Sequence, residues 1–190
     1  GTSHRPHAST TVIAKYFPNN KFSGYLLDRE VRAISKVLRS GKKPVLAIIG
    51  GAKISSKITV INSILQRADD VIIGGGMAFT FIKALGGQIG SSIFEKEFLE
   101  EAKLILANAK SKGVKIHLPI DVVCSLEFSN DSKKRVFEVN KIPEMWQGLD
   151  SGPKTSKAFH DVIMKSKTIL WNGPVGVFEM GNFSKGTISL

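Results

Sequence analysis

The stretch "VLAIIGGAKISSKITVINSIL" (residues 45–65) carries the signal that decides the fold. It opens with a continuous apolar run, breaks at Gly50 and Gly51, and continues with isoleucines at 58, 61 and 64. An unbroken apolar run is typical of a strand buried on both faces of a parallel sheet, and the later spacing is helical. The stretch therefore predicts a strand, a glycine turn and a helix, which together form the repeating unit of an α/β fold.

The same arrangement recurs along the chain. Further strand-like runs are "DVIIGGG" (70–76), "KIHLPIDVVCS" (115–125) and "KTILWNGP" (167–174), and segments with helical spacing, such as 94–109, lie between them. Alternating strands and helices predict a three-layer αβα sandwich with a doubly wound, mainly parallel, Rossmann-like sheet. We expect the chain to hold this fold in a form truncated at both ends, with an open sheet edge where a terminal strand is lost.

Residues 1–41 do not follow this pattern. "YLLDREVRAISKVLRSG" (25–41) predicts one helix, with Asp28 as its N-cap and Gly41 as its stop. We expect residues 1–23 to be the tail of an earlier domain and residues 24–41 to be an interdomain helix. Residues 42–190 would then form a second, incomplete domain, so we interpret the chain as a fragment.

Composition limits the classes of function. The content of 42% hydrophobic and 23% charged residues is that of a globular protein. No apolar run approaches the roughly 20 residues that cross a bilayer, so no membrane partner is expected. The net charge of +11 is spread along the chain, which predicts solvated basic faces rather than a nucleic-acid site. A single cysteine predicts neither a disulfide nor a metal site, and it favours a reducing, cytoplasmic location. We expect a monomer.

Three of the predicted strands end in glycine, in "IIGGAK", "IIGGGMAF" and "LWNGPVG". Parallel sheets bind ligands beyond the carboxyl ends of their strands, and free N–H groups at helix starts favour anions. Three such turns predict a nucleotide or phosphate crevice, although the two common glycine-rich phosphate motifs are absent. Lys53 and Lys57 fit this prediction, because cations are poorly placed in a first helical turn unless a polyphosphate lies between them. Ser55 and Ser56 could cap that helix. The alternative is that both lysines are exposed and their spacing is chance.

Four segments, taken together and in order, resemble the phosphoglycerate kinase family: "LAIIGGAKISSKITVINSIL", "VIIGGGMAFTF", "MWQGLDSGPKT" and "ILWNGPVGVFE". "GTSHRPHAS" at the start is similar to a stretch near the end of the N-terminal domain of that family. The resemblance covers all 190 residues. It implies a two-domain glycolytic enzyme that closes about a hinge, with 3-phosphoglycerate on the N-terminal domain and MgADP or MgATP on the C-terminal domain. The reaction would transfer a phosphoryl group between 1,3-bisphosphoglycerate and ADP.

The resemblance also implies roles for individual residues. Lys53 and Lys57 match the catalytic lysines that hold the nucleotide phosphates and the phosphoryl group in transfer. Arg5 matches an arginine that binds 3-phosphoglycerate. Further positions match the nucleotide cleft: Gly51, Gly74, Gly75, Gly148, Leu149, Asn172, Pro174 and Glu179.

Two departures from the family limit these expectations. Many members have aspartate where this chain has Ser56, and the chain ends before a further glycine-rich motif that ends in aspartate. We therefore assign no residue to Mg²⁺ and expect the chain alone to bind nucleotide without turnover. Alternatives are a non-catalytic nucleotide-binding module, a basic nucleic-acid binder and another α/β phosphotransferase. Other residues are interpreted as structural, namely Phe79, Phe81, Phe94, Phe98, His117 and Cys124, while Asp121 receives no role.

Overall fold

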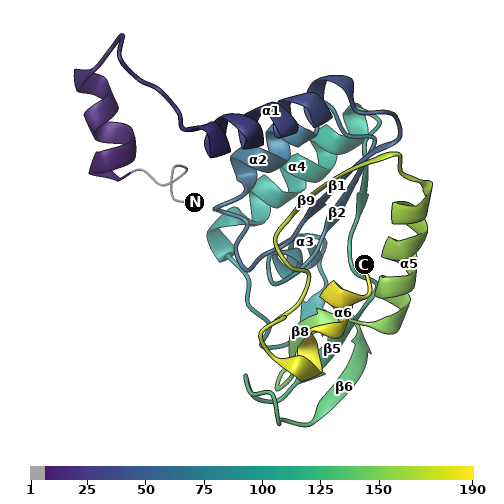
Figure 1. The fold of residues 1–190 in the computed structure, drawn as a ribbon. Coiled ribbons are helices and arrows are strands. Elements are labelled where there is room, and N and C mark those ends of the chain that lie inside the picture. The colour runs from purple at the N-terminus through teal and green to yellow at the C-terminus, as the bar shows by residue number, and fades with distance from the viewer. Residues whose placement is uncertain (1–6) are drawn as a thin grey trace. The chain divides into compact units, whose positions relative to one another are not determined.

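The structure is a computed structural model that describes residues 7–190, apart from the side chains of residues 38 and 39 (Figure 1). Contacts divide the chain into two compact units, residues 1–36 and residues 37–190. The described part of the first unit holds a π-helical turn (Ala8–Val12), a 3₁₀ turn (Ile13–Tyr16) and most of helix α1 (Tyr25–Ser40). The domain boundaries predicted at residues 23 and 41 stay predictions.

Helix α1 forms where its spacing predicts it, but its start differs. The helix begins three residues before Asp28, so the prediction of Asp28 as the N-cap is wrong. The Asp28 carboxylate instead pairs with Arg32 Nε at 2.7 Å, one turn along the helix. The helix ends at Ser40, directly before Gly41, as predicted.

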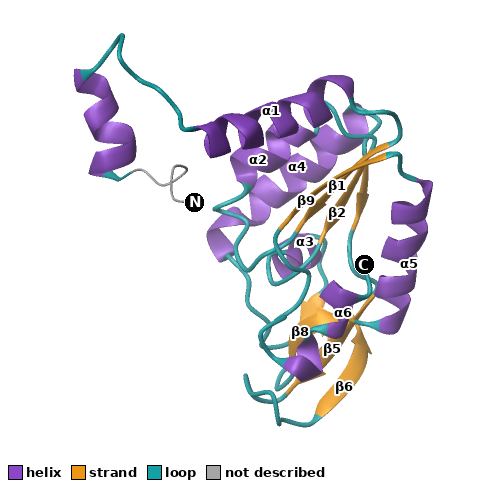
Figure 2. Ribbon diagram, in the orientation of Figure 1, coloured by secondary structure: helices purple, strands orange, loops and turns teal. Residues whose placement is uncertain are grey.

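A four-stranded parallel sheet forms the centre of the second unit (Figure 2). Its strands are β1 (Val45–Ile49), β2 (Asp70–Ile73), β4 (Lys115–His117) and β9 (Thr168–Asn172), in the order β4-β2-β1-β9. The chain adds strands on one side of β1 and later returns to add β9 on the other side. The strand order therefore reverses between β1 and β9, and ligands bind at such reversals in open α/β sheets.

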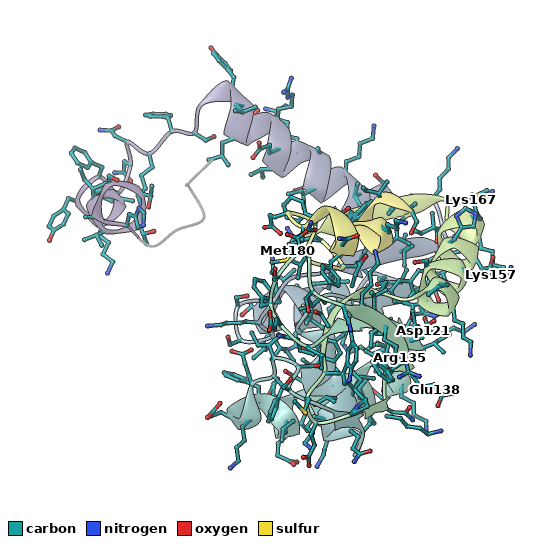
Figure 3. All side chains as sticks on the ribbon, turned by 90° about the horizontal axis from the view of Figure 1, so that it is seen from below. Asp121, Arg135, Glu138, Lys157, Lys167 and Met180 are labelled. Carbon is teal, nitrogen blue, oxygen red and sulfur yellow. The ribbon has the colours of Figure 1, made fainter. Side chains whose placement is uncertain are left out.

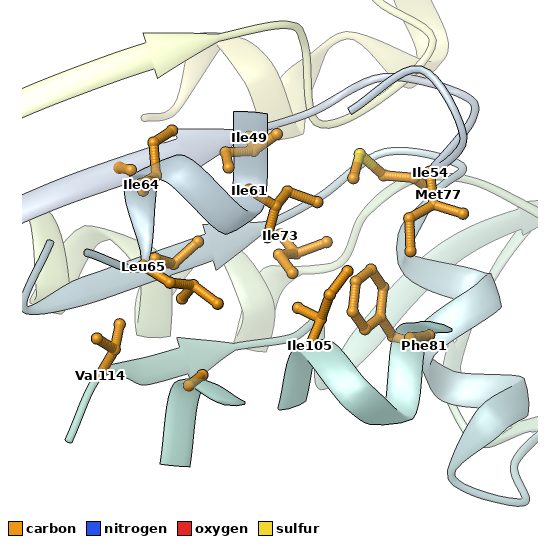
Figure 4. Packing of buried hydrophobic residues seen from close by; sticks show 14 of the residues in the cluster. Ile49, Ile54, Ile61, Ile64, Leu65, Ile73, Met77, Phe81, Ile105 and Val114 are labelled. Atoms are coloured by element: carbon orange, nitrogen blue, oxygen red, sulfur yellow. The ribbon is translucent and has the colours of Figure 1, made fainter. Parts of the chain in front are cut away.

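Helices cover both faces of the sheet at β1, as its continuous apolar run predicts, whereas Ile169 and Trp171 of the edge strand β9 are 42% and 43% exposed. On one face, Ala47 and Ile49 of β1 pack with α2 (Ile58–Ile64), α3 (Ala78–Ala84) and α4 (Leu99–Ser111) (Figure 4). On the other face, Leu46 and Ile48 pack with Phe159 of α5 (Pro153–Lys165). Successive residues of β1 thus point to opposite cores, and all five are buried.

A second, antiparallel sheet was not predicted. It consists of β5 (Asp121–Ser125), β6 (Lys134–Glu138) and β8 (Gln147–Ser151). A short parallel pair of β3 (Gln88–Ile89) and β7 (Lys141–Ile142) forms a separate sheet that shares a hydrophobic core with it. Single 3₁₀ turns form at Lys96–Phe98, before α4, and at Gly181–Phe183, after β9. Helix α6 (Lys185–Ile188) is one turn long. Phe79 and Ile82 of α3 pack on this sheet with Val122 and Cys124.

The prediction of one strand over 115–125 is therefore wrong, because β4 and β5 belong to different sheets. Pro119 interrupts the run, since proline has no N–H to donate to a ladder. After it, the Ile120 and Asp121 N–H groups both donate to Thr155 Oγ1 at 2.9 Å, so α5 takes the hydrogen bonds that a continuing strand would have used.

Three of the four phenylalanines expected in the core pack there. Phe79 and Phe81 are 4% and 0% exposed, and Phe98 is half-buried against the first core. Phe94 is 37% exposed, and it lies outside α4, which begins at Leu99. The apolar spacing of residues 94–109 therefore overstated the length of the helix.

Candidate functional site

Three glycine-containing turns meet at the carboxyl ends of β1, β2 and β9. We call residues 50–51, 74–76 and 173–174 the glycine turns. Their backbones bond directly to one another: the Gly51 N–H donates to the Pro174 carbonyl at 3.0 Å, and the Met77 N–H donates to the Gly51 carbonyl at 3.0 Å. The Gly75 N–H donates to the carbonyl of Val175 at 3.2 Å. Strand ends that are far apart in the sequence thus form one backbone surface.

Glycine is required at two of these positions. A Cβ on Gly50 would lie 2.0 Å from the Pro174 carbonyl oxygen, and that oxygen belongs to rigid backbone. Gly75 has a φ of +69°, and a Cβ there would lie 2.7 Å from the Gly51 oxygen. The glycines therefore allow three backbones to approach more closely than any side chain permits.

A cavity of about 430 Å³ opens beside the glycine turns. One part of its lining is the backbone of Gly51, Gly75 and Pro174. The remainder is mostly apolar side chains, which we call the apolar lining: Phe79, Ile93, Val122, Phe128, Leu149, Val175 and Val177. A largely apolar pocket with a few polar groups at one end is the usual form of a site for a small organic ligand.

The structure brings most of the predicted site residues together. Six of them line the cavity: Gly51, Gly75, Gly148, Leu149, Pro174 and Glu179. Gly74 is tied behind the lining, where its N–H donates to the Ile49 carbonyl at 3.0 Å. Arg5 lies outside the described residues.

Lys57 joins the first glycine turn to the end of β9. Its Nζ hydrogen-bonds Oδ1 of Asn172, a residue predicted for the same site, and it lies beside the Gly51 backbone. Lys53 is exposed in the loop that precedes α2. The two lysines are therefore not one turn apart on a helix, because α2 begins only at Ile58.

The predicted capping of α2 by serine is also wrong. Lys57 holds the N-cap position without a side-chain cap, and Ser56 Oγ donates back to the Lys53 carbonyl at 3.0 Å. The N–H groups of Lys57 and Ile58 both donate to the Ile54 carbonyl, at 2.8 and 3.1 Å. These amides at the helix start are therefore not free for an anion.

Asp150 belongs to the cavity lining but was not singled out in the sequence. It is 4% exposed, and it accepts hydrogen bonds from the N–H groups of Gly186 at 2.8 Å and Ser151 at 2.9 Å. Burial raises the pKa of Asp150 to about 6, against the lowering effect of those two hydrogen bonds. Its place inside "QGLDSGP", between two predicted site residues and a helix start, was the only sequence signal.

Asp121, which received no role, is a structural carboxylate. It is 3% exposed and accepts the N–H groups of Thr155 and Lys154 at 2.8 and 3.1 Å (Figure 3). It therefore caps the first turn of α5, although it comes from a strand more than 30 residues earlier. Only the fold brings these segments together.

Two structural interpretations are supported by the packing. Cys124 is fully buried, and burial raises the pKa of its thiol to about 12, so it behaves as an apolar core residue. His117 Nε2 lies 2.7 Å from Asp70 Oδ1, which ties the neighbouring strands β4 and β2 together.

Among residues 7–190, no cluster of three or more His, Cys, Asp or Glu side chains is arranged to hold a metal ion. Over the same residues, no helix combines the length and apolar character that a bilayer span requires.

Comparison with known proteins gives consistent results. The family model for phosphoglycerate kinase matches residues 1–190. A phosphoglycerate kinase from Elusimicrobium minutum (strain Pei191) is 50% identical over the whole chain, which spans 47% of that relative. The structure of phosphoglycerate kinase from Coxiella burnetii matches with a TM-score of 0.84 and 41% identity over 88% of this chain and 43% of that one. Phosphoglycerate kinase from Pyrococcus horikoshii OT3 matches with a TM-score of 0.79 and 25% identity over 99% of this chain and 47% of that one.

The chain therefore spans about half the length of the relatives it matches, and its match to the family model is complete from end to end. This chain belongs to the phosphoglycerate kinase family.

Proposed function

We propose that the cavity binds ADP or ATP, and that this chain supplies the nucleotide-binding part of a phosphoglycerate kinase. The observation that carries the proposal is the convergence of three glycine turns on one cavity at the reversal of strand order, with Lys57 held beside the first of these turns. The reaction would be reversible phosphoryl transfer between 1,3-bisphosphoglycerate and ADP, which gives 3-phosphoglycerate and ATP.

The two parts of the lining suit the two parts of a nucleotide. The apolar lining offers Phe79 and Leu149 to a base, and Glu179 lies where a ribose hydroxyl could donate to it. The glycine turns let phosphates approach the backbone, while Lys53 and Lys57 would neutralise their charge. Phosphoryl transfer needs positioning and charge neutralisation more than covalent chemistry, so these groups match the task.

Mg²⁺ would arrive with the nucleotide rather than occupy a site built by this chain. The loop that carries the lysines has Ser56 where many members of the family have aspartate, and the described residues contain no group of three or more His, Cys, Asp or Glu side chains placed to hold a metal ion. Magnesium is commonly held by substrate phosphates with one or two carboxylates. The described residues do not fit a preformed Mg²⁺ site.

We further propose that 3-phosphoglycerate or 1,3-bisphosphoglycerate contacts Arg5, that domain closure about a hinge brings the substrates together, and that the protein is a cytoplasmic, glycolytic monomer. The 190-residue chain alone would bind nucleotide without turnover. If nucleotide binding had no catalytic purpose, the chain would be a nucleotide-binding module, which is the alternative.

Calorimetric titration of the 190-residue chain with MgADP tests the proposal. Saturable binding is expected, and Lys57→Ala should weaken it about 10- to 100-fold, as expected when a charged hydrogen bond to phosphate is lost. Lys110→Ala, an exposed lysine of α4, removes the same charge elsewhere and should bind like the wild type. Absence of binding by a chain that circular dichroism shows to be folded would contradict the proposal.

An assay for ATP formation from 1,3-bisphosphoglycerate and MgADP tests the expected lack of turnover. The purified chain should form no ATP above the uncatalysed background. Measurable formation would show that the chain carries a complete catalytic site.

A further inference from the structure

The loop of residues 52–57, which we call the lysine loop, connects the first glycine turn to α2. It carries Lys53 and Lys57 at its two ends, and only Ile54 between them is buried. Ile54 anchors the loop in the core, and the exposed residues beside it take their position from the groups that hydrogen-bond them. That position sets where both ammonium groups lie relative to the cavity.

Ser55, at the middle of the lysine loop, is held by a single residue 40 positions along the chain. Its N–H donates to Glu95 Oε2 at 2.9 Å, and its hydroxyl donates to Glu95 Oε1 at 2.6 Å. Both oxygens of the Glu95 carboxylate therefore accept hydrogen bonds from the same loop residue. Charge-assisted bonds of this kind are stronger than neutral ones and fix orientation as well as distance.

Glu95 is itself anchored to the wall of the cavity. Its N–H donates to Thr80 Oγ1 at 3.1 Å, and Thr80 is 1% exposed in α3. Helix α3 follows directly on the glycine turn of residues 74–76 and carries Phe79 of the apolar lining. The contacts thus run from a buried threonine, through Glu95, to the loop that bears the lysines.

The charge state of Glu95 supports this arrangement. Burial alone would raise its pKa, but the hydrogen bonds from Ser55, a backbone bond from Ile54 and the charge of Lys53 together hold the pKa below its usual range. The carboxylate is therefore ionised at neutral pH, when both of its oxygens are needed as acceptors.

We propose that Glu95 is a positioning residue of the nucleotide site: by clamping Ser55 to α3, it sets the lysine loop so that Lys53 and Lys57 meet the nucleotide phosphates. This inference rests on the proposed function. It predicts that loss of the clamp harms recognition of phosphates but not of the base. No contact of Glu95 with the nucleotide is needed.

Calorimetric titrations with MgADP and with adenosine separate this role from a general loss of stability. Glu95→Ala should weaken MgADP binding about tenfold, the range for one hydrogen bond to a charged group, and leave adenosine binding unchanged. Glu95→Gln should bind MgADP nearly as the wild type does, because its amide can accept from the Ser55 N–H and donate to the Ser55 hydroxyl. Glu97→Ala, an exposed carboxylate two residues along, is the matched charge control.

A wild-type chain that is folded but does not bind MgADP would contradict the proposed function, and the inference with it. A Glu95→Ala chain that binds MgADP like the wild type, or that loses MgADP and adenosine equally, would overturn the inference alone. Tighter MgADP binding by Glu95→Gln would also overturn it, because the carboxylate would then act by repelling phosphate.

Amide hydrogen exchange tests the clamp without any nucleotide. In the wild-type chain the Ser55 N–H should be protected, and in Glu95→Ala it should exchange faster. The Gly51 N–H, bonded to Pro174, should be unchanged in both. Equal exchange at Ser55 in the two proteins would show that Glu95 does not hold the loop.

Discussion

The two parts of the cavity lining differ in the atoms that form them: one is backbone and the other is apolar side chains. The glycine turns are backbone packed on backbone, with Gly50, Gly75 and Pro174 in contact across three strand ends. The apolar lining is made of side chains from α3, β5 and β8 and from the loops that follow β3, β5 and β9. A backbone surface cannot adjust to an added atom, whereas a side-chain surface can repack. We therefore expect a Gly→Ala substitution to destabilise the protein more in the glycine turns than beside the apolar lining.

The largest expected effect is that of Gly50→Ala. The new Cβ would lie 2.0 Å from the Pro174 carbonyl oxygen, and no side-chain rotation can relieve a contact between backbones. We expect a loss of unfolding free energy of about 3 kcal/mol or more, measured by urea denaturation. Gly181→Ala is the control, because a Cβ there meets nothing within 4 Å. If Gly50→Ala and Gly181→Ala were equally stable, the claim that the backbone of the glycine turns cannot adjust to an added atom would be contradicted.

A smaller loss of stability, which a second substitution should partly reverse, is expected where Gly148 contacts Phe79 of the apolar lining. A Cβ on Gly148 would lie 2.2 Å from the end of the Phe79 ring, so Gly148→Ala overpacks a side chain and should cost about 1–3 kcal/mol. Adding Phe79→Leu removes the clashing ring atoms, and the double variant should recover part of the loss. Strictly additive losses in the double-mutant cycle would show that the contact is not the cause.

Asp150, a buried carboxyl group of the cavity lining, makes the stability of the fold depend on pH. Burial raises its pKa to about 6 from 3.8, so the folded chain holds this proton more tightly than the unfolded chain does. Its contribution to stability is therefore complete below about pH 4 and is lost as the pH rises through about 6. The difference in unfolding free energy between the wild type and Asp150→Asn should fall over this range by at most roughly 1.4 kcal/mol per pH unit.

Two observations would contradict the prediction for Asp150. One is a difference that stays constant from pH 4 to 7. The other is an NMR titration of the wild-type carboxyl with a midpoint near 4, a measurement that does not depend on the variant folding.

The smallest effect is expected at Cys124, behind the apolar lining. Its thiol is fully buried and burial raises its pKa to about 12, so at pH 8 it should not react with a thiol reagent in the native chain. Unfolding in urea should make it react fully. Rapid labelling in native buffer would show that this side of the cavity opens readily.

The difference between the two parts of the lining also explains what could be predicted from the sequence. Continuous apolar runs leave a local signal, so the strands before Gly50, Gly74 and Gly173 were located correctly, although β9, before Gly173, is an edge strand whose residues are half-buried or exposed. Their meeting at one edge followed from strand direction alone. The same logic failed at residues 115–125, because an apolar run records burial and not chain direction, and only Pro119 marked the turn.

Residues that act through distant partners left little or no signal. Glu95 meets Ser55 across 40 positions, and Asp150 meets Gly186 across 36. Nothing local distinguishes these carboxylates from solvated ones. Their contacts depend on which distant segments the fold brings together. The role expected for the two lysines stays a prediction, and their expected helical spacing was wrong, since a loop precedes α2.

The most direct test of the account is amide chemical-shift mapping of the 190-residue chain by NMR as MgADP is added. The account predicts that ADP perturbs both parts of the lining at once, with the shifts largest at Gly51, Gly75, Gly148 and Leu149, and with matching saturation at all four. Shifts confined to one part of the lining, or spread over exposed lysines such as Lys157 and Lys167 (Figure 3), would contradict it.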